Sequence, residues 1–488
     1  MLSASPAADR ENHPLVSLRG LLLALAAAVL LSWPMLILSA PLMFSDSAFY
    51  IKQGSSIWHM LTELVLAASA PDLETAAPSS GAAAPAPAAA SATWSVRSAP
   101  YPFFAYISSL SPLGLAGTVI LQSAAVFFML FAVVRREFEA PAVDVALVVL
   151  ACGTLTSLPW FTSYLMPDFL AAAVILYAAV LVRSFDTLST SQRVVLGLLA
   201  AFAIGSHYGH MPLAVACIGA ALAFRLWQRR LGVSVVIAAV APVVAVVAFN
   251  AAVGMAVFDG ASAAPRRLPV LLARSIEDGP ARLHLEAHCT TARYTICEVF
   301  PEIPSSVDAV MWSEGSLLET ASPEQMNRIR EEEFLILWRA FLDYPLQQTW
   351  SLIGNTVEQF VSVGTRDFLF AEIKRQDGRV VADFNREHLR GLLDAFGLVH
   401  AASVVFGLVA LAMMAWADRL RVGRWEREVV MVVLVGLLAN AAIFGGLSAP
   451  ADRYQSRVAW LVPVMAGLFW LERRRQRAIS VQPLAYGR

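Results

Sequence analysis

The chain has 488 residues, of which 58% are hydrophobic and 15% are charged, and its formal net charge is -1. A soluble domain usually carries about a quarter charged residues, and a nucleic-acid-binding protein shows a basic surface, so the composition argues against both classes. The apolar residues instead form runs long enough to cross a bilayer, which takes roughly 20 residues per helix. We therefore predict an all-α polytopic membrane protein.

The first apolar run, Leu21 to Leu42, follows Arg10 and Arg19. It is longer than the apolar core of a signal peptide, and Pro41 makes a poor cleavage site, so we predict a retained first helix. About 10 membrane-spanning helices follow from the same criterion, at 20–42, 114–134, 143–160, 168–184, 193–208, 211–225, 231–252, 393–417, 428–448 and 457–472.

Loop charges predict the orientation, because cytoplasmic loops carry the excess of Lys and Arg. One set of short loops is rich in arginine: Arg10, Arg19, Arg135, Arg136, Arg183, Arg193, Arg225, Arg229, Arg230, Arg419, Arg421, Arg424, Arg427, Arg473, Arg474, Arg475 and Arg477. The opposite short loops contain only Arg453, with Arg457 at the edge of the next span. We predict that both termini are cytoplasmic and that the membrane is a bacterial inner membrane.

This orientation predicts two long extracytoplasmic segments. The first, 43–113, contains an expected interfacial helix from Tyr50 to Leu66 and a Pro/Ala/Ser tract from Ala77 to Ala92. Such a tract cannot bury enough apolar surface to order itself. The second segment, 255–390, is the expected soluble-like domain. It separates a membrane region at 1–254 from C-terminal membrane helices at 391–488.

Two helices are predicted within the second segment. Glu324 to Leu342 has a helical pattern, and Pro345 to Val363 reads as an amphipathic helix on the membrane surface. Cys289 and Cys297 bound the stretch CTTARYTIC, and an oxidising compartment favours a structural disulfide between them. His284 and His288 lie beside it and read as surface histidines.

Unusual polar residues gather at the predicted outer ends of the spans. Asp46 follows the first helix, ahead of Tyr50 and Lys52, and either binds a ligand or caps the next helix. In the next outer turn, Trp160 and Tyr164 are expected interfacial residues. Asp168 follows Pro167 at a helix start, where a carboxylate is favourable with the helix dipole.

Two further outer turns carry candidate ligand-binding side chains. The motif SHYGHMP contains His207 and His210, which either contact a ligand, bind a metal or are interfacial polar residues. The last turn contains Asp452, Arg453 and Tyr454. A fixed guanidinium there suits a phosphate group, and its alternative is a surface pair with Asp452 or contact with lipid headgroups. We expect no metal and no bound cofactor.

The order of these features resembles the GT-C superfamily of membrane glycosyltransferases, such as protein O-mannosyltransferases and lipid A aminoarabinose transferases. Asp46 in SDSAFY takes the place of the family's acid after the first helix, and RSAPYPFF, from Arg97, looks like its basic segment before the second helix. Pro167-Asp168 and Arg453-Tyr454 match two later pairs. Ser47 stands where many members have a second acid, and the segment 255–390 matches no member known to us.

The resemblance implies transfer of a sugar, with inversion, from a polyprenyl-phosphate carrier to an acceptor hydroxyl. Asp46 would be the general base and Arg453 would stabilise the phosphate. Further substrate-binding candidates are Arg97, Lys52, Tyr101, Tyr454, Asp168, His207 and His210. The expected partners are the lipid-linked sugar, an unassigned acceptor and membrane lipids. A polysaccharide polymerase, another lipid-phosphate enzyme, a transporter and an assembly factor remain alternatives.

Overall fold

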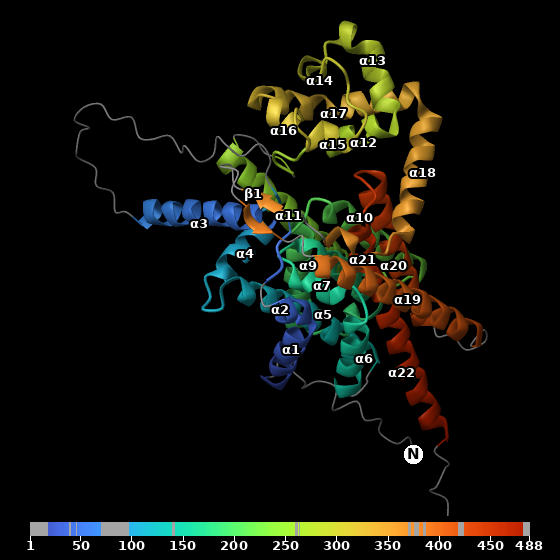
Figure 1. The fold of residues 1–488 in the computed structure, drawn as a ribbon. Helices are drawn as coiled ribbons and strands as arrows, with labels where there is room; N and C mark the ends of the chain where they lie inside the picture. Colours follow the sequence, from blue (N-terminus) through green and yellow to red (C-terminus); the bar gives the residue numbers. More distant parts are fainter. Residues whose placement is uncertain are drawn as a thin grey trace, which may run out of the picture.

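The computed structural model describes residues 18–38, 41–44, 46–69, 97–138, 142–258, 262, 264–368, 372–374, 380–383, 387–417 and 424–481. The described chain is nearly all helical (Figure 1). Its elements are α1 (Leu18–Leu31), α2 (Trp33–Leu38), α3 (Ser47–Ser69), α4 (Pro100–Ser109), α5 (Gly114–Phe138), α6 (Ala142–Thr154), α7 (Leu158–Ser163), η3 (Pro167–Phe169), α8 (Leu170–Arg183), η4 (Phe185–Thr187), α9 (Thr190–Gly205), α10 (His210–Trp227), α11 (Val233–Phe258), α12 (Val270–Asp278), α13 (Pro280–Ala292), α14 (Thr295–Val299), α15 (Val307–Met311), α16 (Leu317–Thr320), α17 (Pro323–Asp343), α18 (Pro345–Val361), η5 (Arg366–Phe368), β1 (Glu372–Lys374), β2 (Val380–Asp383), α19 (Glu387–Ala417), α20 (Arg424–Ala441), η6 (Ala442–Gly446), α21 (Asp452–Ala459) and α22 (Leu461–Val481).

Four helical segments of the described chain are long and apolar enough to cross a membrane: His210–Trp227, Val233–Met255, Leu389–Ala417 and Arg427–Gly446. They coincide with four of the predicted spans. Gly114–Phe127 and Thr190–Gly205 are shorter apolar helical segments at two more of the predicted positions. The described chain therefore has the features of an all-α membrane protein.

Three predicted spans are interrupted rather than continuous. The run at 20–42 is divided at Ser32, just before Pro34, and the run at 143–160 breaks between α6 and α7, just before Pro159. The run at 457–472 is divided at Trp460, shortly before Pro463. Proline has no N–H for the helical ladder and its ring crowds the preceding turn, which accounts for a break beside each one.

α8 is the central helix of the bundle. Every residue from Leu170 to Val182 is buried, because α9, α10 and α20 pack around it. A helix that is apolar all round is expected in such a position. α1 packs against α5, and α19 packs against α22. The main core of the chain is centred on this bundle.

α12 to α17 form a separate helical unit, which we call the cap domain (Figure 1). It has its own hydrophobic core, which includes Leu272, Ile276, Met326 and Ile336. α17 begins with a capping box, in which Ser322 and Gln325 exchange side-chain and backbone hydrogen bonds. Such a box satisfies free N–H groups of the first turn.

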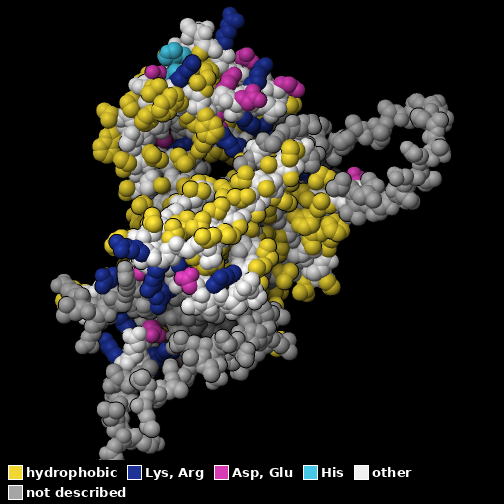
Figure 2. Space-filling model, turned by 180° about the vertical axis from the view of Figure 1, so that it is seen from behind, with side chains coloured by type: hydrophobic (Ala, Val, Ile, Leu, Met, Phe, Trp, Pro, Cys, Tyr) yellow, Lys and Arg dark blue, Asp and Glu magenta, His cyan; other side chains and the backbone are white. Residues whose placement is uncertain are grey.

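α18 follows α17 after a sharp corner and runs from the cap domain to the bundle, where it packs against η6 and α20 (Figure 1). It occupies the segment for which an amphipathic helix on the membrane surface was predicted. Its apolar side chains Leu346, Trp350 and Val357 are largely exposed. Figure 2 shows hydrophobic side chains gathered over much of the bundle and part of the cap domain.

Three segments depart from, extend or fall outside the sequence predictions. β1 and β2 pair as an antiparallel hairpin that the all-α prediction did not include. α3 occupies the place of the predicted interfacial helix 50–66 and extends it at both ends. The Pro/Ala/Ser tract at 77–92 lies outside the described residues.

Candidate functional site

A short chain segment after α2 holds the first acid in place. Leu42 forms a parallel bridge with Tyr164: its N–H donates to the carbonyl of Ser163 at 3.1 Å, and its carbonyl accepts from Leu165 N–H at 3.0 Å. The Ser47 hydroxyl donates to the Leu165 carbonyl at 2.7 Å. The start of α3 is thereby fixed to the turn between α7 and α8. This docking brings the predicted site residues of both segments to one side of the bundle.

Asp46 lies at the start of α3 and forms an ion pair with Arg97. Arg97 Nη2 donates to Asp46 Oδ1 at 2.7 Å, and the side chains are 29% and 31% exposed, respectively. Gln53 fixes the backbone of Arg97, because its amide accepts from Arg97 N–H at 3.0 Å and donates to Arg97 O at 2.6 Å. Burial lowers the pKa of Arg97, but the neighbouring Asp46 and Tyr50 raise it to a net value above its ordinary one.

A second ion pair lies deeper. Arg457 is fully buried, and its Nη1 donates to Asp168 Oδ1 at 2.9 Å. Its Nε and Nη2 donate to Asn440 Oδ1 at 3.2 and 2.9 Å, and its guanidinium lies 3.6 Å from the ring centroid of Phe444. The pair joins α21 to η3, so it helps to assemble the site.

Arg453 has different partners. Its guanidinium lies 4.4 Å from the Phe44 ring centroid and 4.7 Å from that of Tyr454, and its Nη2 donates to the Tyr454 hydroxyl at 2.9 Å. Burial lowers the pKa of Arg453, but Tyr454 and Asp168 raise it to a net value above its ordinary one. Within the described chain, its guanidinium makes no ion pair with a carboxylate. It is therefore the arginine of this site best able to receive an anion.

The two histidines of SHYGHMP lie at the other edge of the site, His207 in the turn between α9 and α10 and His210 at the start of α10. The ring centroids of His207 and His210 are 5.2 Å apart, and both rings contact Phe444. His210 Nδ1 bonds to the Ala203 carbonyl at 2.8 Å, while its buried Nε2 has no hydrogen-bond partner among the described residues. A buried nitrogen of this kind usually has a partner, so it is a candidate ligand contact.

These groups belong to one electrostatic cluster, which we call the polar cluster: Asp46, Arg97, Asp168, His207, His210, Arg453 and Arg457. Asp168 interacts with both histidines as well as with Arg457 and Arg453. Arg453 also interacts with Asp46. With neutral histidines, its three guanidinium groups and two carboxylates leave a net charge of +1, which suits an anionic ligand.

Tyrosines line the same region. Tyr101 is fully buried, donates to Gln122 Oε1 at 3.0 Å and packs edge-on against Tyr50, with centroids 5.1 Å apart. Burial, and then the charge of Asp46, raises the pKa of Tyr50; burial, and then the charge of Asp168, raises the pKa of Tyr101. Both hydroxyls therefore stay protonated at neutral pH.

The remaining predicted residues have other surroundings. Lys52 is exposed on α3. Cys289 and Cys297 are bonded to each other in the cap domain, with their Cα atoms 5.7 Å apart. Asp452 does not pair with Arg453; it packs against Gly364, beside the Arg366–Phe368 turn. Burial raises the pKa of Asp452, and nearby Asp367 adds to this effect.

Sequence reasoning missed the role of Arg457 and its partner Asn440. A signal for Arg457 was present, because an arginine in an apolar run costs about 2.5–3.5 kcal/mol at a helix centre and is retained where it has a partner. Asn440 gave no comparable signal. A single amide in a predicted span does not indicate which distant residue it will contact.

An apolar cavity of about 1000 Å³ lies beside α4. It is lined by Trp58, Pro100, Phe103, Phe104, Ile107, Ser108, Leu110, Ser111, Leu121, Ala201, Phe202, Ala245, Val246 and Phe249. Pro100 is the first residue of α4 and follows Arg97 by three positions. Its ring also packs near Gly205, at the end of α9. Through Pro100, one wall of the apolar cavity lies three residues along the chain from Arg97 of the polar cluster.

No protein-family model matches the chain, and searches of curated proteins and of solved structures found no match.

Proposed function

We propose that the protein is a membrane glycosyltransferase that transfers a sugar, with inversion, from a polyprenyl-phosphate carrier to an acceptor hydroxyl on the extracytoplasmic face. Arg453 carries the proposal, because this guanidinium lacks a carboxylate partner in the described chain and interacts with Asp46 at a distance. Ten membrane spans, cytoplasmic termini and an extracytoplasmic cap domain belong to the same proposal. The arginine-rich loops on one side of the predicted spans support that orientation.

The carrier would be held by two kinds of surface. Its phosphate would accept hydrogen bonds from Arg453, since guanidinium groups match phosphate oxygens through two parallel bonds. Its apolar tail would lie in the apolar cavity beside Phe103, Phe202 and Phe249. Lipid-binding sites combine such an apolar wall with a few placed polar groups.

The proposed chemistry needs one base. The acceptor hydroxyl oxygen attacks the anomeric carbon, the bond from that carbon to the phosphate oxygen breaks, and the phosphate takes the electron pair. Asp46 takes the hydroxyl proton, while Arg453 and Arg97 stabilise the charge on the departing phosphate. Phosphate leaves without a proton, so the second carboxylic acid that a glycosidase uses is not required.

Reconstituted protein supplied with a panel of radiolabelled polyprenyl-phosphate sugars tests the proposal. We expect wild type to move label from at least one carrier to an acceptor or to water, and Asp46→Asn and Arg453→Ala to fail. Arg328→Ala, which removes an exposed arginine of the cap domain, is the matched control and should keep full activity. Intact wild-type protein that consumes no carrier would refute the proposal, and label joined into a long glycan would favour a polymerase instead.

A further inference from the structure

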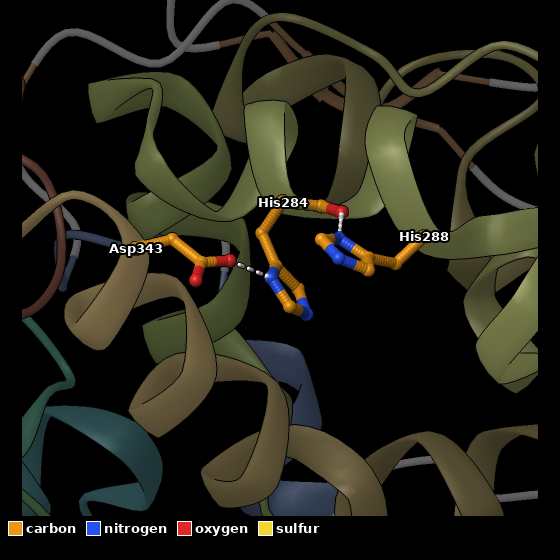
Figure 3. Close-up of side chains that lie close together, drawn as sticks. All are labelled: His284, His288 and Asp343. Atoms are coloured by element: carbon orange, nitrogen blue, oxygen red, sulfur yellow. Dashed lines mark hydrogen bonds and ion pairs between the residues drawn. The ribbon is translucent and has the colours of Figure 1, made fainter.

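Three side chains that can bind a metal meet on the cap domain, apart from the polar cluster. His284 and His288 lie one turn apart on α13, so both project from the same face of the helix. Asp343 is the last residue of α17. Figure 3 shows the Asp343 carboxylate and the His288 ring on either side of the His284 ring. One ligand atom from each of the three residues lies within 4.8 Å of the others.

The hydrogen bonds leave a lone pair available on His288. Its Nδ1 contacts the His284 carbonyl at 2.9 Å. A carbonyl only accepts, so this nitrogen carries the proton, and Nε2 of the neutral ring keeps its lone pair. The His288 side chain is exposed, and the two imidazole rings stack with their centroids 4.5 Å apart. A neutral histidine with an accessible lone pair is a common ligand for transition metals.

His284 is held more firmly. Its Nδ1 bonds to Asp343 Oδ2 at 2.6 Å, and its Nε2 contacts the Tyr294 hydroxyl at 3.1 Å. Arg339 Nη1 donates to the same hydroxyl at 3.0 Å. Tyr294 lies in the loop that the Cys289–Cys297 disulfide closes. A metal would replace one of the two His284 hydrogen bonds, and the remaining bond would orient the ring as outer-shell partners do.

We propose that His284, His288 and Asp343 form a binding site for one divalent transition-metal ion of the zinc type, with solvent as the remaining ligand. Two imidazoles select against Mg²⁺ and Ca²⁺, which take oxygen ligands, and in favour of zinc and its neighbours. Zinc bonds of roughly 2.0–2.2 Å place tetrahedral ligand atoms about 3.4 Å apart. The present ligand atoms lie within 4.8 Å of one another. To reach the shorter separation, the stacked His288 ring and the Asp343 side chain, which is 42% exposed, would have to rotate toward the ion.

The position gives the site a structural consequence. A metal would connect α13 to the residue that ends α17, directly before the corner at Tyr344 and Pro345. From this corner α18 runs to the bundle and packs against η6. The ion would therefore stiffen the joint between the cap domain and the bundle, independently of the proposed sugar transfer.

Metal titration of the tag-free, full-length protein in detergent tests this site. After removal of bound metal with a chelator, Co²⁺ is titrated and followed by its visible absorption, and Zn²⁺ is then added as a competitor. We expect one saturable equivalent in wild type, displaced by Zn²⁺. His288→Gln and Asp343→Asn should each weaken binding by roughly tenfold or more, as loss of a ligand or its partner does. His59→Gln, which changes an exposed histidine of α3, should bind like wild type.

A second readout separates a metal site from a structural hydrogen-bond group. Zn²⁺ should raise the thermal midpoint of wild type and of His59→Gln, but not that of His288→Gln or Asp343→Asn, because only a bound ligand stabilises the folded state. Circular dichroism and gel filtration confirm that each variant is folded. Absence of saturable binding in wild type, or binding that survives both substitutions unchanged, would overturn the proposal.

Discussion

Breaking the pair between Asp168 and Arg457 is expected to destabilise the bundle strongly. Arg457 is completely buried and the Asp168 side chain is 10% exposed, so water cannot replace a lost partner. Removing one member of a buried ion pair costs about 3–5 kcal/mol, because the other charge remains unpaired. Arg457→Met leaves Asp168 without its charged partner, so we expect a cost in this range.

Two further variants should lose less stability than Arg457→Met. Asp168→Asn should cost less than Arg457→Met, because the amide oxygen still accepts from Arg457 and Asn440 still binds the guanidinium. The double variant Asp168→Leu/Arg457→Met removes both charges and should recover much of the loss, as replacement of buried pairs by apolar groups often does. The two substitutions are therefore strongly non-additive.

Thermal unfolding in detergent, followed by gel filtration of the heated samples, gives the midpoint of each variant and so ranks their stabilities. At roughly 2–4 °C per kcal/mol for chains of moderate length, Arg457→Met should lower the midpoint by about 6 °C or more. Arg225→Met removes a buried arginine that pairs with Asp186 on another part of the bundle, and its midpoint is compared with that of Arg457→Met. Equal midpoints for wild type, Arg457→Met and the double variant would refute the reasoning, since they would mean that the pair is hydrated.

Four further predictions follow from other contacts. Arg453→Lys should keep its charge and stay folded but show little more transfer activity than Arg453→Ala, because an ammonium lacks the guanidinium's planar pair of donors. The initial rates of the two variants measure this difference. Ala245→Trp should raise KM for long-chain carriers more than for a short-chain analogue, because the indole occupies part of the apolar cavity; equal KM changes for both would contradict the placement of the tail. Burial raises the pKa of Glu333 and Arg267 lowers it, and the net pKa is above its ordinary value. The folded state therefore binds the Glu333 proton more tightly than the unfolded state does. The stability that this proton contributes is fully present below the unfolded pKa and is lost as pH rises through the folded pKa. Midpoints of wild type should therefore fall more between acid and neutral pH than those of Glu333→Gln. Arg97→Gln, which removes the guanidinium paired with Asp46, should lower the initial rate of transfer, because that guanidinium would also stabilise the departing phosphate; an unchanged rate would contradict this role.

Much of the helical pattern could be predicted from the sequence, because long apolar runs and capping residues are local signals. α17 and α18 lie within a residue or two of the segments predicted from periodicity and from Pro345. The interruptions beside Pro34 and Pro159 were not predicted, although proline is the local signal that marks them. A hydropathy window averages over such positions, so it detects the apolar run and misses the break.

The candidate site was only partly predictable. Asp46, Arg97 and Arg453 were recognised one by one, as polar residues at the ends of predicted helices. Their ion pairs depend on how distant segments dock, for example Leu42 against Tyr164. The choice of Arg97 as partner for Asp46 and of Arg457 as partner for Asp168 follows from this docking. Neither sequence distance nor residue type contains that information.

The pairing of Asp46 with Arg97 has a consequence for the proposed reaction. While Asp46 Oδ1 accepts a hydrogen bond from Arg97 at 2.7 Å, Arg97 competes with the acceptor hydroxyl for this oxygen. An arriving phosphate competes for Arg97, since the polar cluster carries a net positive charge and Arg453 already attracts the same anion. Donor binding would then release Asp46, and the base would become active only when a carrier is present. In this order of events the carrier itself frees the Asp46 carboxylate for the acceptor hydroxyl, which explains how an acid next to an arginine can serve a transferase.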